Sequence, residues 1–143
     1  MPHLVILYTG QLDHEVSMTA LCRQLADAML TVHDEDGKQV FPTGGTRVLA
    51  YPAPHYAVAD GGAAGREAGG TGDYAFVYLN VRMGRGRSEA TQQRAGQTLL
   101  EVAKVFFAPV MAQRHIGITL QIDVGPEVFD AKHSNIHPLF NKT

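Results

Sequence analysis

The strongest constraint on this chain is a strand-helix-strand pattern that occurs twice. The apolar run at residues 4–7 is short, rich in β-branched side chains and followed by Gly10, so residues 2–9 are predicted to form a buried strand. Residues 15–32 repeat apolar side chains at the helical period, which predicts an amphipathic helix. A second strand is predicted over residues 47–50, which completes the first unit.

The second unit follows the same plan. Residues 74–81 combine aromatic and β-branched side chains, which predicts a third strand. Ser88 is a favourable N-cap for an amphipathic helix that extends to about residue 113. Residues 116–122 alternate apolar and polar side chains and are predicted to form the fourth strand.

Together the two units predict an α+β fold with the order β-α-β-β-α-β. Right-handed crossovers place both helices on one face of a four-stranded sheet. Pro52 and Pro54 cannot donate ladder hydrogen bonds, so the second strand is predicted to lie at an edge of the sheet or to end early. No further helix is predicted to cover the other face, and oligomerisation through the sheets is the simplest way to bury it.

The two units are joined by a glycine-rich segment at residues 61–72. It has almost no apolar side chain to anchor it, so we expect a mobile loop. The chain has 143 residues and is 45% hydrophobic, which suffices for one core. Residues 1–143 are therefore predicted to form a single domain.

Charge and composition narrow the class of partner. The net charge of −2, from 12 basic and 14 acidic residues, argues against a general nucleic-acid binder. The sequence contains no apolar run of the roughly 18 residues that a membrane helix needs, and its start lacks the features of a secretion signal. The single cysteine, Cys22, is interpreted as an inert packed thiol. We therefore expect a cytoplasmic protein with a small-molecule partner and no membrane association.

Arginines supply the candidate binding groups. Arg47 begins a predicted strand and Arg87 lies between a strand and a helix, so both are expected at an end of the sheet. A guanidinium group holds a carboxylate in two-point geometry, and both residues are therefore candidate substrate-binding residues. Arg82 and Arg85 are interpreted as solvated surface residues. Residues 84–88 resemble an anion-binding helix start but lack the lysine of a phosphate loop.

Two segments resemble metal-binding motifs, but the residues around them argue against metal binding. His133 and His137 have the spacing of two ligands on one helix face, but Pro138 stops a helix there. Residues 34–37 place a glycine too early for a calcium loop, and the closing glutamate is absent. We expect neither a metal nor a cofactor.

The candidate catalytic group is at the start of the chain. Methionine before a small residue is commonly removed, and loss of Met1 would leave Pro2 with a free secondary amine at the start of a rigid strand. The reference pKa of an α-amino group is about 7.7 to 8.0, and burial or nearby cations lower it. Such an amine can act as a general base near neutral pH.

Several of these segments occur in the order typical of one family. They are Pro2-His3, Phe41-Pro42-x-x-Gly45-x-Arg47, residues 73–77 leading into Gly84-x-Gly86-Arg87-Ser88, and Asn135-x-His137-x-Leu139-Phe140. The set resembles the 5-carboxymethyl-2-hydroxymuconate Δ-isomerases of the tautomerase superfamily over nearly the whole chain. The resemblance implies the β-α-β tautomerase fold, a homotrimer and a role in bacterial breakdown of homoprotocatechuate. It also assigns catalysis to Pro2 and substrate binding to Arg47 and Arg87.

Two segments depart from the family pattern and leave the substrate open. Residues 62–72 separate parts that the family joins more closely, and the turn at residues 33–40 is longer. One alternative is a tautomerase for another 2-oxo or 2-hydroxy acid, since arginines recognise little beyond the carboxylate. The other is a non-catalytic trimer that binds an anionic metabolite, which retention of Met1 would favour.

Overall fold

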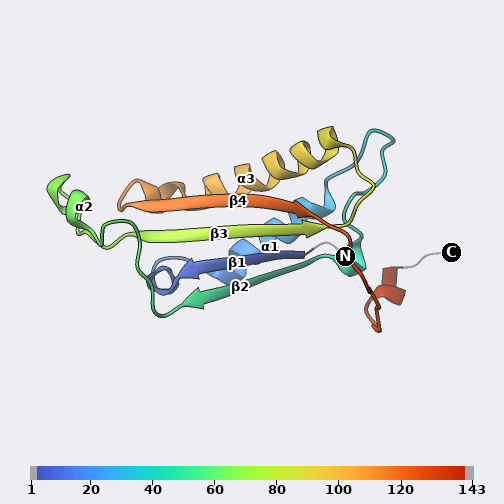
Figure 1. Cartoon of the computed structure of the whole chain (residues 1–143), viewed down its shortest axis with the longest axis horizontal. Coiled ribbons are helices and arrows are strands. Elements are labelled where there is room, and N and C mark those ends of the chain that lie inside the picture. Colours follow the sequence, from blue (N-terminus) through green and yellow to red (C-terminus); the bar gives the residue numbers. More distant parts are fainter. Residues whose placement is uncertain (1–2, 141–143) are drawn as a thin grey trace.

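One mixed sheet organises the molecule (Figure 1). Its strands are β1 (His3–Thr9), β2 (Arg47–Ala53), β3 (Ala75–Met83) and β4 (Ile116–Val124). Their order across the sheet is β2-β1-β3-β4, and β1 pairs parallel with β2 and antiparallel with β3, while β3 and β4 are parallel. The computed structural model describes residues 3–140. The predicted α+β fold with a four-stranded sheet is confirmed.

Two long helices cover one face of this sheet, as predicted. They are α1 (Met18–Leu30) and α3 (Glu89–Met111), and both lie on the same side of the strands in Figure 1. Each helix begins where a serine Oγ accepts a backbone hydrogen bond, Ser17 from Ala20 and Ser88 from Thr91, both at 3.1 Å. Within residues 3–140, no helix has both the length and the hydropathy needed to cross a bilayer.

The core lies between the sheet and these helices. On β1 the alternate residues Leu4 and Ile6 are fully buried, and Val77, Leu79 and Val81 repeat this pattern on β3. The helices contribute residues spaced by four positions, all of them fully buried: Leu21, Leu25 and Met29 from α1, and Ala95, Leu99, Ala103 and Phe107 from α3.

The opposite face of the sheet, here called the open face, bears apolar side chains without a covering layer from residues 3–140. Leu7 of β1 is 48% exposed, and its neighbours Leu49 and Tyr51 on β2 are 46% and 51% exposed. The predicted edge position of the second strand is confirmed, and Pro52 lies on it. The sheet is thus half covered, as the sequence predicted.

The glycine-rich segment contains the short helix α2 (Ala63–Glu67), where the sequence predicted an unanchored loop. That prediction overlooked polar anchors. The Asp60 carboxylate accepts hydrogen bonds from the backbone of Gly62 at 2.8 Å and Ala64 at 2.9 Å, and the Tyr74 hydroxyl accepts one from Gly65 at 2.8 Å. Gly62 has φ +113°, and a Cβ there would lie 2.1 Å from a backbone oxygen. The mobility of residues 61–72 stays a prediction.

Candidate active site

The predicted substrate-binding arginines lie at the end of the sheet where β1 begins, here called the basic end. His3 is paired with Arg47 of β2 on one side and with Arg82 of β3 on the other. Paired residues of neighbouring strands point to the same face, so these three side chains form one row across the open face. The predicted base, Pro2, directly precedes this row in the chain and lies outside the described residues.

The surroundings of His3 favour its neutral form. Burial is the main cause that lowers the pKa of this imidazole below its usual value of 6.5, and positive charges that include Arg47 and Arg82 lower it further. A neutral imidazole both donates and accepts a hydrogen bond, which a protonated ring cannot do. The residue after Pro2 is therefore a polar but uncharged group between two cations.

The two predicted substrate-binding arginines both lie at this basic end. Arg47 is the first residue of β2, and its Nη1 donates to the Gly45 carbonyl at 3.4 Å. Arg87 lies in the turn between β3 and α3, and its Nη2 donates to the Val40 carbonyl at 2.7 Å. The backbone contact orients the half-buried Arg87 guanidinium while leaving it a cation that can bind an anion.

The start of α3 already binds a carboxylate from the chain itself. Glu35 Oε1 accepts hydrogen bonds from the hydroxyls of Ser88 and Thr91, the latter at 2.9 Å. The Ser88 bond is the main cause that lowers the pKa of Glu35. A carboxylate of the chain itself therefore lies at this helix start, and binding of an external anion there stays a prediction. Sequence reasoning considered the turn around Glu35 only as a calcium loop and did not predict this contact, because Glu35 is far from Ser88 and Thr91 in the chain.

The chain's last turn packs beside the basic end. The 3-10 turn His137–Phe140 lies against the turn Thr43–Gly45, which immediately precedes β2. A Cβ on Gly44 would approach His137 to 3.0 Å, so glycine permits this contact. His133 lies outside any helix, and the two-histidine helical spacing is not realised. The C-terminal segment thus supports the loop that leads into Arg47.

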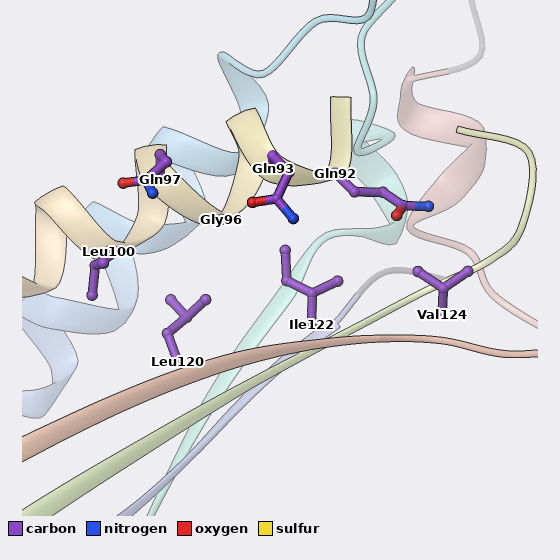
Figure 2. A pocket seen from close by; sticks show the side chains of 8 residues that line it. All are labelled: Gln92, Gln93, Gly96, Gln97, Leu100, Leu120, Ile122 and Val124. Atoms are coloured by element: carbon purple, nitrogen blue, oxygen red, sulfur yellow. The ribbon is translucent and has the colours of Figure 1, made fainter. Parts of the chain in front are cut away.

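A separate pocket lies between α3 and the edge strand β4 (Figure 2). Its lining consists of glutamines and small or aliphatic residues: Gln92, Gln93, Gly96, Gln97, Leu100, Leu120, Ile122 and Val124. No ionisable side chain is among them, so the pocket has neither a base nor a cation for a carboxylated substrate. The predicted substrate-binding residues Arg47 and Arg87 lie at the basic end instead.

The β-α-β-β-α-β sheet with both helices on one face is the fold of the tautomerase superfamily. A fused 4-OT trimer, 15% identical with a TM-score of 0.55 over 97% of this chain and 99% of its own, shares the fold. The sequence pattern of the 5-carboxymethyl-2-hydroxymuconate isomerase family matches residues 2–140, and the chain belongs to this family of isomerases.

Individual relatives agree along the whole chain. A solved 5-carboxymethyl-2-hydroxymuconate delta-isomerase is 67% identical, with a TM-score of 0.96 over 100% of this chain and 95% of its own. The isomerase structure from Deinococcus radiodurans R1 is 30% identical, with a TM-score of 0.78 over 99% and 95%. The Delta-isomerase of Escherichia coli is 26% identical over 98% of this chain and 99% of its own.

Proposed function

We propose that this isomerase acts on 5-carboxymethyl-2-hydroxymuconate, with Pro2 as the general base. After removal of Met1, the proline nitrogen accepts the proton of the 2-hydroxyl group. The C2 oxygen becomes a carbonyl, the conjugated double bonds shift, and the proton is returned at the distal carbon to give the 2-oxo-3-ene isomer. No proton is gained or lost overall, and no cofactor is required.

The observation that carries this proposal is the strand register around the first described residue. His3, the residue after Pro2 in the sequence, lies between Arg47 and Arg82, and we propose that these cations disfavour the protonated form of the Pro2 amine. That effect suits a base working near neutral pH. The same cations favour the negative charge that develops on the dienolate during proton transfer.

Arg47 and Arg87 are proposed to bind substrate carboxylates. Arg47 approaches from β2, and Arg87 from the turn after β3 where the Val40 carbonyl orients it. Guanidinium groups on opposite sides of the first strand can hold two carboxylates of one extended substrate. The proposed substrate belongs to breakdown of homoprotocatechuate.

The working assembly is proposed to be a homotrimer of single-domain chains. The half-exposed Leu7, Leu49 and Tyr51 form an apolar area on the open face that a second and third copy would cover. Light scattering should give three times the chain mass, and a stable monomer at micromolar concentration would contradict this assignment. The free, half-buried Cys22 suits the reducing cytoplasm, where we place the enzyme.

Two measurements on one preparation test the function. Intact mass shows whether Met1 has been removed, and an ultraviolet assay follows disappearance of 5-carboxymethyl-2-hydroxymuconate. Processed protein should catalyse the reaction. Processed protein that is inactive on this compound but active on another 2-oxo or 2-hydroxy acid would identify a different tautomerase. Retained Met1 with carboxylate binding and no turnover would instead identify a binding trimer.

A further inference from the structure

Arg82 is the cation of the basic end that the proposed mechanism leaves without a role. It is on the central strand β3, directly opposite His3, and its side chain is exposed on the open face. Neighbouring strands are about 4.8 Å apart, so Arg47 and Arg82 flank His3 at a separation of roughly 10 Å between their backbones. The row therefore presents two guanidinium groups with an imidazole between them.

Nothing in residues 3–140 neutralises the Arg82 guanidinium by a direct ion pair. The nearest carboxylate in register is Asp123 of β4. Its Oδ2 instead accepts a hydrogen bond from Asn80 Nδ2 at 2.8 Å, and Asn80 is two residues from Arg82 on the same face. Like charges on neighbouring strands are unfavourable, and an anion bound across the row would relieve this repulsion.

We propose that Arg82 and His3 form a further carboxylate-binding position on the open face. The ligand class is an unsaturated tricarboxylate, and this inference rests on the proposed function. The proposed substrate has three carboxylates, and Arg47 and Arg87 account for two of them. Arg82 offers paired N–H donors to the third, and the neutral imidazole of His3 adds one more donor.

The chain provides a matched control in Arg85. It belongs to the same basic segment and is also exposed, but it lies in the turn after β3 and has no place in the strand register. Arg82→Gln and Arg85→Gln therefore remove the same charge within three residues of each other. Only the first removes a cation from the row beside His3.

The experiment measures trans-aconitate binding to the processed full-length protein by titration calorimetry. This unsaturated tricarboxylate lacks the hydroxyl group on which the proposed reaction begins, so binding is separated from turnover. Arg82→Gln should weaken binding by about 10- to 100-fold, as expected for loss of a hydrogen bond to a charged group, and Arg85→Gln by less than about twofold. Arg82→Lys should restore part of the affinity, because it keeps the charge without the planar donor pair.

A parallel series measures kcat/KM with 5-carboxymethyl-2-hydroxymuconate and thermal unfolding of each variant. Arg82→Gln should lower kcat/KM mainly through KM and should not lower the melting temperature, since removing it relieves repulsion. Equal effects of Arg82→Gln and Arg85→Gln, or unchanged binding in Arg82→Gln, would overturn the assignment. If aconitate binding depends on Arg82 but no isomerisation occurs, the binding position stands and the proposed function fails. Wild-type protein that neither binds aconitate nor uses the muconate would overturn both.

Discussion

The two ends of the sheet differ in whether an arginine is paired with a carboxylate. At the end opposite the basic end, here called the paired end, the Arg114 side chain is 13% exposed and forms ion pairs with Glu15 and with Asp73, the latter at 2.9 Å. At the basic end, Arg82 is exposed and has no carboxylate within ion-pair distance among residues 3–140. One end neutralises its cation within the chain, and the other leaves its cation available to an external anion.

The paired end is built as a network of side-chain hydrogen bonds and ion pairs. Gln11 donates to the Tyr74 carbonyl at 2.8 Å and to Asp73 at 3.2 Å, and the Tyr74 ring meets the His115 ring edge to face at 5.9 Å. The Tyr74 hydroxyl also accepts a hydrogen bond from Gly65 in the segment that carries α2. The comparison predicts that changes at the basic end alter catalysis, whereas changes at the paired end alter stability or local order.

The largest effect should follow from one extra residue at the basic end. A form that retains Met1 converts the Pro2 nitrogen into an amide without basicity, so isomerase activity should fall by orders of magnitude while folding and assembly stay nearly normal. Pro2→Ala should be milder, because a primary amine remains. Mass spectrometry together with the ultraviolet assay checks this. Full activity in protein shown to retain Met1 would refute the proline mechanism.

The next effect concerns the two assigned arginines. Arg47→Ala and Arg87→Ala should each reduce kcat/KM by the equivalent of about 1.5 to 3 kcal/mol, the range for hydrogen bonds to charged groups. Lysine should restore little where two-point contact matters. Steady-state kinetics on the processed protein, with Arg85→Gln as the control, measures the change. If both alanine variants kept wild-type kcat/KM, Arg47 and Arg87 would be surface residues that do not bind the substrate.

Sequence reasoning succeeded where one local rule dominates. The order of strands and helices along the chain, the Ser88 cap and the open face all follow from periodicity, capping and crossover handedness. It missed contacts between residues far apart in the chain, such as Glu35 with Ser88, because no local pattern specifies them. It also interpreted Arg82 as a surface residue, since its place beside His3 depends on the register between two strands.

At the paired end, loss of a charge should affect stability and leave catalysis unchanged. Arg114→Met removes the cation shared by Glu15 and Asp73, and about 1 to 2 kcal/mol of unfolding free energy should be lost, because those carboxylates are partly exposed. Urea unfolding measures the loss. The kcat/KM of the folded variant should match that of wild type. A loss of activity without a loss of stability would show that the paired end also contributes to catalysis.

A smaller and more local effect is expected at α2. Hydrogen bonds from the Ala64 and Gly62 backbone, and from Tyr74, lower the pKa of Asp60 from 3.8 to about 2. The ionised Asp60 carboxylate therefore stabilises the start of α2 above pH 3.8, and this stabilisation is lost as the pH falls toward 2. Asp60→Ala should accelerate amide exchange at residues 62–66 at neutral pH, with activity unchanged. Unaltered exchange would mean that the Tyr74 contact alone holds this helix.

The smallest expected effect is a shift in the pKa of His3, which lies in register between Arg47 and Arg82. Burial first, and then positive charges that include Arg47 on β2 and Arg82 on β3, lower the pKa of this imidazole below 6.5. Because the unfolded chain takes up the proton at higher pH, this group costs no stability above pH 6.5. Below that value it progressively destabilises the fold until the folded imidazole is also protonated.

Nuclear magnetic resonance titration of the His3 ring should therefore give a midpoint below 6.5. Arg82→Gln should raise that midpoint only part of the way, since burial is the larger cause and Arg47 remains, and Arg85→Gln should leave it unchanged. Bound trans-aconitate should raise it as well, because carboxylates across the row offset the positive charge that resists protonation. A wild-type midpoint at or above 6.5, or equal shifts in the two variants, would show that the arginines do not act on His3 as the strand register implies.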